Sequence, residues 1–162
     1  MRIRDEQGQA LVETAVSMGL FIVLMLGAVE VGSLAYTAMA VNSAAKAAAQ
    51  YGAQNHSTAI DQAGMLQSAK NDSNLTGLTL TSPSGAPPTT ATSANGYTCS
   101  CADTGTVVSC TNNSPTSPSC PGSFVEVTIL VQTQVTYHPL IQIPALPTTF
   151  TLYGRAKQQV LQ

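Results

Sequence analysis

Charged side chains are scarce in this sequence of 162 residues: Asp, Glu, Lys and Arg together make up only 9%. A soluble domain usually carries about a quarter. Tryptophan is absent, aromatic residues make up 5%, and the six basic residues form no cluster. Nucleic-acid binding needs several Lys or Arg on one face to displace counterions from phosphates, and base stacking needs aromatic rings. The composition therefore argues against a nucleic-acid partner.

The short motifs that carry chemistry are also missing. The sequence has no Gly-x-Ser-x-Gly, no phosphate-binding loop and no pair of carboxylates in a polar setting. Its two histidines, His56 and His138, stand alone in segments expected to be loops. We therefore expect no catalytic residue, no cofactor and no metal site, and a protein that is not an enzyme.

What the sequence does contain is an apolar first third. Between Glu13 and Glu30 lies an uncharged run, residues 14–29, with no visible polar face. As a helix this run would span about 24 Å, slightly less than the roughly 30 Å of a hydrocarbon core. The flanking residues 10–12 or 31–41 supply the missing length. The pattern predicts a transmembrane anchor.

The same helix is expected to continue into water, from about Ala10 to Tyr51. Residues 33–53 are rich in strong helix formers, and Gly52 stands where a helix often ends. A stripe of apolar residues recurs at helical spacing: Leu34, Val41, Ala45 and Ala48. This stripe predicts an amphipathic half that packs on a folded domain.

A second, shorter helix is expected from Ser57 or Thr58, one of which would cap it, to Lys70. The apolar residues that would face the core are Ile60, Ala63, Met65 and Leu66. Residues 82–96, rich in Pro, Gly, Ser and Thr, should form a loop.

The remainder predicts antiparallel strands. Residues 124–137 and 149–156 alternate between apolar and polar side chains, and the three prolines of 138–147 make that segment their connection. The apolar faces are Val125, Val127, Ile129, Val131, Val135 and Tyr137 in the first run and Phe150, Leu152 and Ala156 in the second. Residues 97–102 and 106–110 flank a hairpin signal. The predicted class is α+β, with a long amino-terminal helix packed on a small antiparallel sheet.

Four cysteines fall within one polar stretch of this second half: Cys99, Cys101, Cys110 and Cys120. Their even number predicts disulfides formed in an oxidising compartment, and Cys-x-Cys without a nearby His fits a zinc site poorly. Cys99 and Cys101 are too close to bond to each other, which leaves two complete pairings. We favour Cys99 with Cys110, because a turn at 103–106 would place them opposite, and Cys101 with Cys120.

The junction before the apolar run is the most informative segment. It reads Gly8-Gln9-Ala10-Leu11-Val12-Glu13 after a short polar start. This resembles the processing site of type IV prepilins and pseudopilins, where a Gly precedes the cut and a Glu follows four residues later. Glycine gives a peptidase an extended and unhindered backbone. Glu13 would be costly in a membrane unless it is paired, and the resemblance implies the amino terminus of a neighbouring subunit as its partner.

Residues 8–53 as a whole resemble the TadE-like family. The shared features are the opening GQALVE, the apolar run, the step Glu30-Val31-Gly32 and an Ala-rich helix that ends near Tyr-Gly-Ala. Residues 124–160 are similar to the carboxy-terminal half of the family, whereas 75–122 match no family we can name. Major Flp pilins carry Tyr after the processing-site Glu, and Thr14 stands there in this sequence.

The resemblance implies a minor pilin or pseudopilin that helps initiate or assemble a tight-adherence (Flp/Tad) pilus. It implies three parts: a leader, 1–8; a transmembrane and extended helix, 9–53; and an extracytoplasmic α+β domain, 54–162. Implied partners are a prepilin peptidase, other pilins or pseudopilins, inner-membrane assembly proteins and membrane lipid. The implied location is the bacterial inner membrane, crossed once, with the pilus as a second location. The basic residues before the span, Arg2 and Arg4, favour a cytoplasmic amino terminus.

Small residues four apart in the span would permit close helix packing, although such pairs are common in Ala- and Gly-rich segments. They are Ala15 with Gly19 and Ala28 with Gly32. For Glu30 we favour a place at the level of the outer headgroups over a pairing role in assembly.

Two other functions compete with assembly. A signal peptidase could cut after Ala40 in Ala38-Met39-Ala40 and release a disulfide-bonded binding domain. Glu30 lies between the apolar run and this site, which counts against that reading. An uncleaved, anchored scaffold or sensor is the third possibility.

Overall fold

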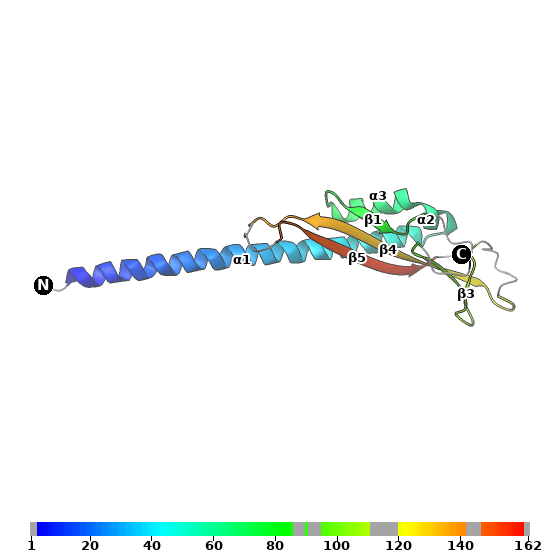
Figure 1. The fold of residues 1–162 in the computed structure, drawn as a ribbon, viewed down its shortest axis with the longest axis horizontal. Helices are drawn as coiled ribbons and strands as arrows, with labels where there is room; N and C mark the ends of the chain where they lie inside the picture. The colour runs from blue at the N-terminus through cyan, green and yellow to red at the C-terminus, as the bar shows by residue number, and fades with distance from the viewer. Residues whose placement is uncertain (1–2, 86–89, 91–94, 111–119, 142–146, 161–162) are drawn as a thin grey trace.

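The computed structural model describes residues 3–85, 90, 95–110, 120–141 and 147–160, with side chains from Gly8 onward. A single helix, α1 (Ile3–Gly52), runs along the molecule, and the other elements cover only its carboxy-terminal half (Figure 1). This half packs on an antiparallel sheet, and two disulfides are present. The predicted α+β architecture is therefore confirmed.

Helix α1 begins at Ile3 rather than at Ala10, so the polar start of the chain continues the helix without a break. The predicted packing stripe is confirmed, because Val41, Ala45 and Ala48 are fully buried and Leu34 is partly buried. Ala44 and Ala49 are buried beside them. Alanine at these positions keeps the side chains short enough for the helix backbone to approach the sheet.

The single helix predicted from 57 to 70 is wrong: two helices stand there, α2 (His56–Ile60) and α3 (Gln62–Ser73). Asp61 separates them, with backbone angles outside the helical region (φ −85°, ψ 81°). Neither Ser57 nor Thr58 caps the first helix; the Asn55 side chain does, by accepting from the Thr58 N–H.

Asp61 has two partners that explain the break. Its carboxylate accepts the Gly64 N–H at 2.9 Å, which caps α3, and the Tyr51 hydroxyl at 2.8 Å. These two hydrogen bonds lower the pKa of Asp61 below its ordinary value. The carboxylate thus joins the end of α1 to the start of α3.

The break also changes which residues face the core. Met65 is fully buried and Leu66 partly buried as predicted, but Ile60 is 50% exposed and Ala63 is exposed. The interruption at Asp61 puts the two helices out of phase, so one continuous helical stripe cannot describe both. Ala59 and Ala69 are the other buried residues of the pair.

Strand β4 (Val125–Tyr137) is the centre of the sheet. Along one edge it pairs with β5 (Phe150–Gln159). Along the other edge it pairs first with β2 (Tyr97–Cys101) and then with β1 (Thr79–Ser82). Strand β3 (Val107–Val108) pairs with the outer side of β2, and all these pairings are antiparallel.

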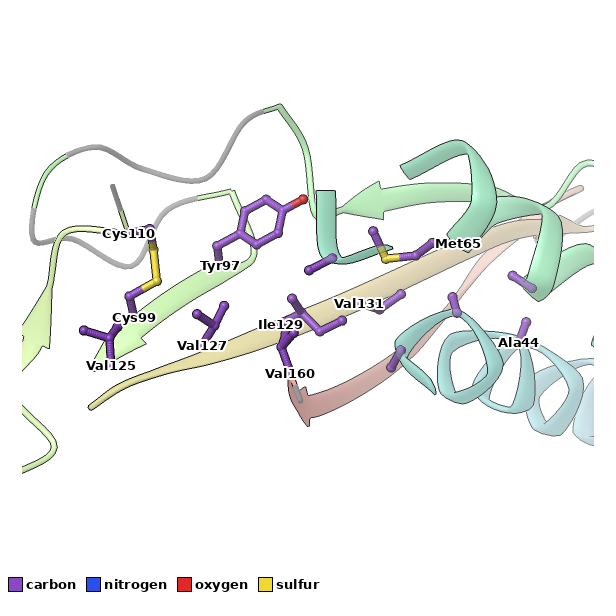
Figure 2. Close-up of a cluster of buried hydrophobic side chains, with 14 of the residues drawn as sticks. Ala44, Met65, Tyr97, Cys99, Cys110, Val125, Val127, Ile129, Val131 and Val160 are labelled. Carbon is purple, nitrogen blue, oxygen red and sulfur yellow. A yellow bond between two sulfur atoms is a disulfide. The ribbon is translucent and has the colours of Figure 1, made fainter. Parts of the chain in front are cut away.

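The predicted inner face of β4 is confirmed, since its odd-numbered residues from Val125 to Val135 are buried and Tyr137 is partly buried. This face includes one polar residue, Thr133. Figure 2 shows the core along β4, with Ala44 and Met65 near one end and the Cys99–Cys110 disulfide at the other.

The other strands differ from expectation in their limits. Strand β1 was not predicted, and β3 has only two residues. Strand β5 runs on to Gln159; Gly154 is its most buried residue, whereas Phe150 is exposed.

The disulfides join Cys99 to Cys110 and Cys101 to Cys120, with Cα–Cα distances of 5.4 and 5.5 Å. The favoured pairing is confirmed. The predicted register is not, because Cys99 lies opposite Val108 and the turn falls between Cys101 and Thr106. Residues 86–89, 91–94, 111–119 and 142–146 of the two predicted loops and of the cysteine stretch lie outside the described residues.

Candidate functional site

Among the described residues, none from another element covers the amino-terminal half of α1. From Gly8 to Val29 every residue is exposed, although the segment is strongly apolar. It is long and apolar enough to cross a membrane, and none of its most apolar window is buried. Exposed apolar surface of this extent marks a membrane or protein contact. The helix therefore fits a membrane anchor.

The candidate processing residues lie on this free helix. Gly8, Gln9 and Glu13 are exposed, and within the described part of the chain the Glu13 carboxylate has no hydrogen-bond or ionic partner. A Cβ at Gly8 would meet nothing within 4 Å. The backbone at Gly8 is helical rather than extended. A peptidase would have to unwind the first turns to reach this bond.

The candidate packing residues are free as well. Ala15, Gly19, Ala28 and Gly32 are all exposed, and a Cβ at either glycine would meet nothing within 4 Å. The structure brings none of them together with another element of the chain. A contact at these positions would have to come from another molecule.

An apolar stripe extends this free surface past the span. Exposed residues recur three or four positions apart on α1: Met18, Ile22, Met25, Val29, Gly32, Tyr36 and Met39. Tyr36 and Met39 are 67% and 65% exposed although they belong to the half of α1 that packs on the sheet. The spacing is that of a helix–helix seam. One side of α1 thus stays open along most of its length.

The opposite side of α1 meets the sheet at very close range. Thr133 on β4 lies opposite Gly154 on β5, and its buried hydroxyl donates to the Val41 backbone oxygen at 3.0 Å. A Cβ at Gly154 would lie 2.6 Å from the Val41 carbonyl carbon and 2.8 Å from the Thr133 hydroxyl oxygen. Only glycine at position 154 allows this approach.

Glu30 lies where the free half of α1 meets the domain. Its carboxylate accepts the Tyr137 hydroxyl at 2.8 Å and the Leu140 backbone N–H at 3.1 Å. The Tyr137 oxygen also shares a hydrogen bond with the Ser33 hydroxyl. Glu30 therefore fixes the end of β4 to the helix, a role that we did not predict from the sequence.

The pKa of Tyr137 reflects these contacts. The hydrogen bond with Ser33 lowers it, but loss of solvent and the neighbouring Glu30 carboxylate together raise it above its ordinary value. The Tyr137 phenol thus keeps its proton near neutral pH and can donate to the Glu30 carboxylate. The sequence held one indication of this contact: Tyr137 is the last of the alternating β4 residues that were predicted to face the core.

We expect the Glu30–Tyr137 contact to stabilise the docked domain. Tyr137→Phe removes the donor and Glu30→Gln weakens the acceptor, so each should lower the melting temperature of the detergent-solubilised chain by about 2–4 °C. The double variant should lose less than the sum of the two single losses, because both changes weaken the same Glu30–Tyr137 hydrogen bond, while each also affects a separate partner, Leu140 or Ser33. Circular dichroism during heating measures this.

A matched control is Tyr153→Phe on β5. Tyr153 is exposed and makes no hydrogen bond among the described side chains. The Tyr153→Phe variant should therefore melt at the same temperature as the parent protein. Additive losses in the Glu30→Gln, Tyr137→Phe double variant would show that the two groups do not interact in solution.

Part of the chain matches a known protein family. Residues 8–50 match the model of the family described as TadE-like protein. This confirms the resemblance over the helix that carries the candidate processing and packing residues, and it implies a protein associated with the Tad pilus. No curated protein and no solved structure matches the chain significantly.

Proposed function

We propose that this protein is a minor pilin or pseudopilin that helps to initiate or assemble a tight-adherence pilus. The observation that carries the proposal is the open side of α1, an apolar stripe that runs from the span to Met39 and stays exposed in the part of the chain that the structure describes. A helix with such a surface associates with other apolar helices. The TadE-like match over residues 8–50 supports the same machine.

In this proposal the partners are a prepilin peptidase, other pilins or pseudopilins, inner-membrane assembly proteins and membrane lipid. The amino terminus lies in the cytoplasm and the sheet domain outside the inner membrane. After cleavage at Gly8, the new amino terminus of one subunit pairs with Glu13 of its neighbour. The small residues Ala15, Gly19, Ala28 and Gly32 let the helices approach closely.

A membrane-anchored scaffold that keeps its first residues is the second candidate function. The uninterrupted helix from Ile3 through Gly8 favours it, since no local break exposes the peptide bond. A secreted domain cut after Ala40 fits less well. That cut would remove the Glu30 and Ser33 contacts to Tyr137 and leave Val41, which is fully buried, as the first residue.

The mass of the mature amino terminus, taken from fractionated cells, separates these functions. A chain that starts at Gln9 supports the pilin-like function. A chain that starts at Met1 supports the anchored scaffold, and one that starts at Val41 supports the secreted domain.

Gly8→Val should block processing if Gly8 precedes the cut. A β-branched side chain would stand where the backbone must enter a peptidase cleft. Precursor that still carries residues 1–8 should then accumulate, visible as the heavier species by mass spectrometry. Gly27→Val is the matched control, because Gly27 lies in the same helix with nothing within 4 Å. Normal cleavage of Gly8→Val would rule out Gly8 as the processing residue.

A further inference from the structure

The carboxy-terminal end of β4 lies beside the helix at the point where α1 leaves the domain (Figure 1), and the connection to β5 begins there. The Leu140 N–H donates to the Glu30 carboxylate, and the Tyr137 hydroxyl donates to the same group. The first four residues of this connection, 138–141, are therefore held at the level of Glu30 along the helix axis.

Residues 140–141 present apolar side chains to the outside at this level. Leu140 is 74% exposed and Ile141 39% exposed. On the helix, Val29 and Val31 are exposed on either side of Glu30. The sequence has no charged residue between Glu126 and Arg155. Apart from Glu30, whose carboxylate accepts from Tyr137 and Leu140, apolar surface thus continues from the free helix onto the end of the domain.

The length of the span sets where this level falls in a membrane. A hydrocarbon core of roughly 30 Å needs about 20 helical residues. If the span begins at Glu13, as the charge pattern indicates, a helix of about 20 residues ends a few residues after Glu30. The Glu30 carboxylate can lie near this boundary because it has two hydrogen-bond donors within the protein. Tyrosine, here Tyr137, is common at the membrane–water interface.

We propose that Leu140 and Ile141 enter the boundary between headgroups and acyl chains of the leaflet that faces the domain. The domain then has a second contact with lipid beside its transmembrane helix, and Glu30 positions both. Two contacts would restrict how far the domain can tilt from the membrane surface. The inference rests on the membrane anchor of the proposed function but not on processing or on pilus assembly.

The absence of tryptophan from the sequence makes a direct test possible. The full chain with Leu140→Trp would be reconstituted in phosphatidylcholine vesicles that contain lipids brominated at chosen depths on their acyl chains. Leu140 is exposed, so the substitution should not disturb folding. We expect blue-shifted emission and quenching that is strongest with bromine close to the headgroups.

Two further single-Trp chains make the result decisive. Val107→Trp lies on β3, at the other end of the domain, and should emit as in water without quenching. Leu24→Trp lies within the span and should be quenched most strongly by deep bromine.

Any other outcome overturns the proposal, and the pattern of quenching shows which part of it fails. Water-like emission from Leu140→Trp, with Leu24→Trp quenched, leaves the anchor intact and removes the second contact. Blue-shifted but unquenched emission would place Leu140 against another protein chain instead of lipid. Absence of quenching at Leu24→Trp would remove the membrane anchor itself, and the second contact with it.

Discussion

Replacing Gly154 with alanine is expected to lower the free energy of unfolding of the sheet domain by about 2–3 kcal/mol. The added methyl group would overlap the Val41 carbonyl of α1 and crowd the Thr133 hydroxyl that donates to it. Both neighbours belong to packed elements: one is helix backbone, and the other is a fully buried side chain. The clash can be relieved only by moving α1 away from β5.

Denaturant titration of the full chain in detergent micelles, followed by circular dichroism, would measure this loss. Gly27→Ala is the matched control, because Gly27 is a helical glycine with nothing within 4 Å. Alanine favours helix over glycine by about 1 kcal/mol, so this variant should be as stable as the parent or slightly more so. An unchanged midpoint for Gly154→Ala would mean that α1 does not approach β5 this closely in solution.

Glu13→Ala is expected to abolish assembly while the protein remains in the membrane at normal abundance. The anchor becomes more apolar, so insertion should persist. What is lost in the proposed assembly is the acidic partner of a neighbour's amino terminus. Removing one member of a buried ion pair costs about 3–5 kcal/mol, which is more than a hundredfold in an association constant.

Shearing and quantification of pili, beside immunoblots of the membrane fraction, would measure both effects. Glu13→Asp, shorter by one methylene, should assemble to an intermediate extent. Ser17→Ala is a control one helical turn further along: Ser17 is equally exposed, but the change removes no charge. Normal pili from cells with Glu13→Ala would contradict the pairing and favour the anchored scaffold.

The parts of the fold that the sequence predicted are those with a strong local period. The alternation of β4 and the packing stripe of α1, which includes Val41, Ala45 and Ala48, each repeat over many residues. Both of these faces are buried as expected. The break at Asp61 has no such signal. Its cause is a tertiary contact, since the Tyr51 hydroxyl and the Gly64 N–H meet on one carboxylate. Strand β1 is too short to show a repeating pattern, and it forms by pairing with β4.

The candidate site divides in the same way. The processing and packing residues of the free helix were predicted from spacing and resemblance, and no contact among the described residues bears on them. Glu30 and Gly154 could not be interpreted from local sequence, because Tyr137 and Leu140 lie more than a hundred positions from Glu30, and Val41 lies as far from Gly154. Only the pairing of β4 with β5, and of both with α1, brings these groups together.

The continuity of α1 has a mechanical consequence. The helix contains no proline, and one face of its last third is buried against the domain, so a single continuous helix about 75 Å long joins the anchor to the domain. Axial force applied at the amino-terminal end of the helix would be transmitted to the domain as translation along the helix axis. A displacement of the helix along its axis by one turn would move the whole domain by about 5.4 Å.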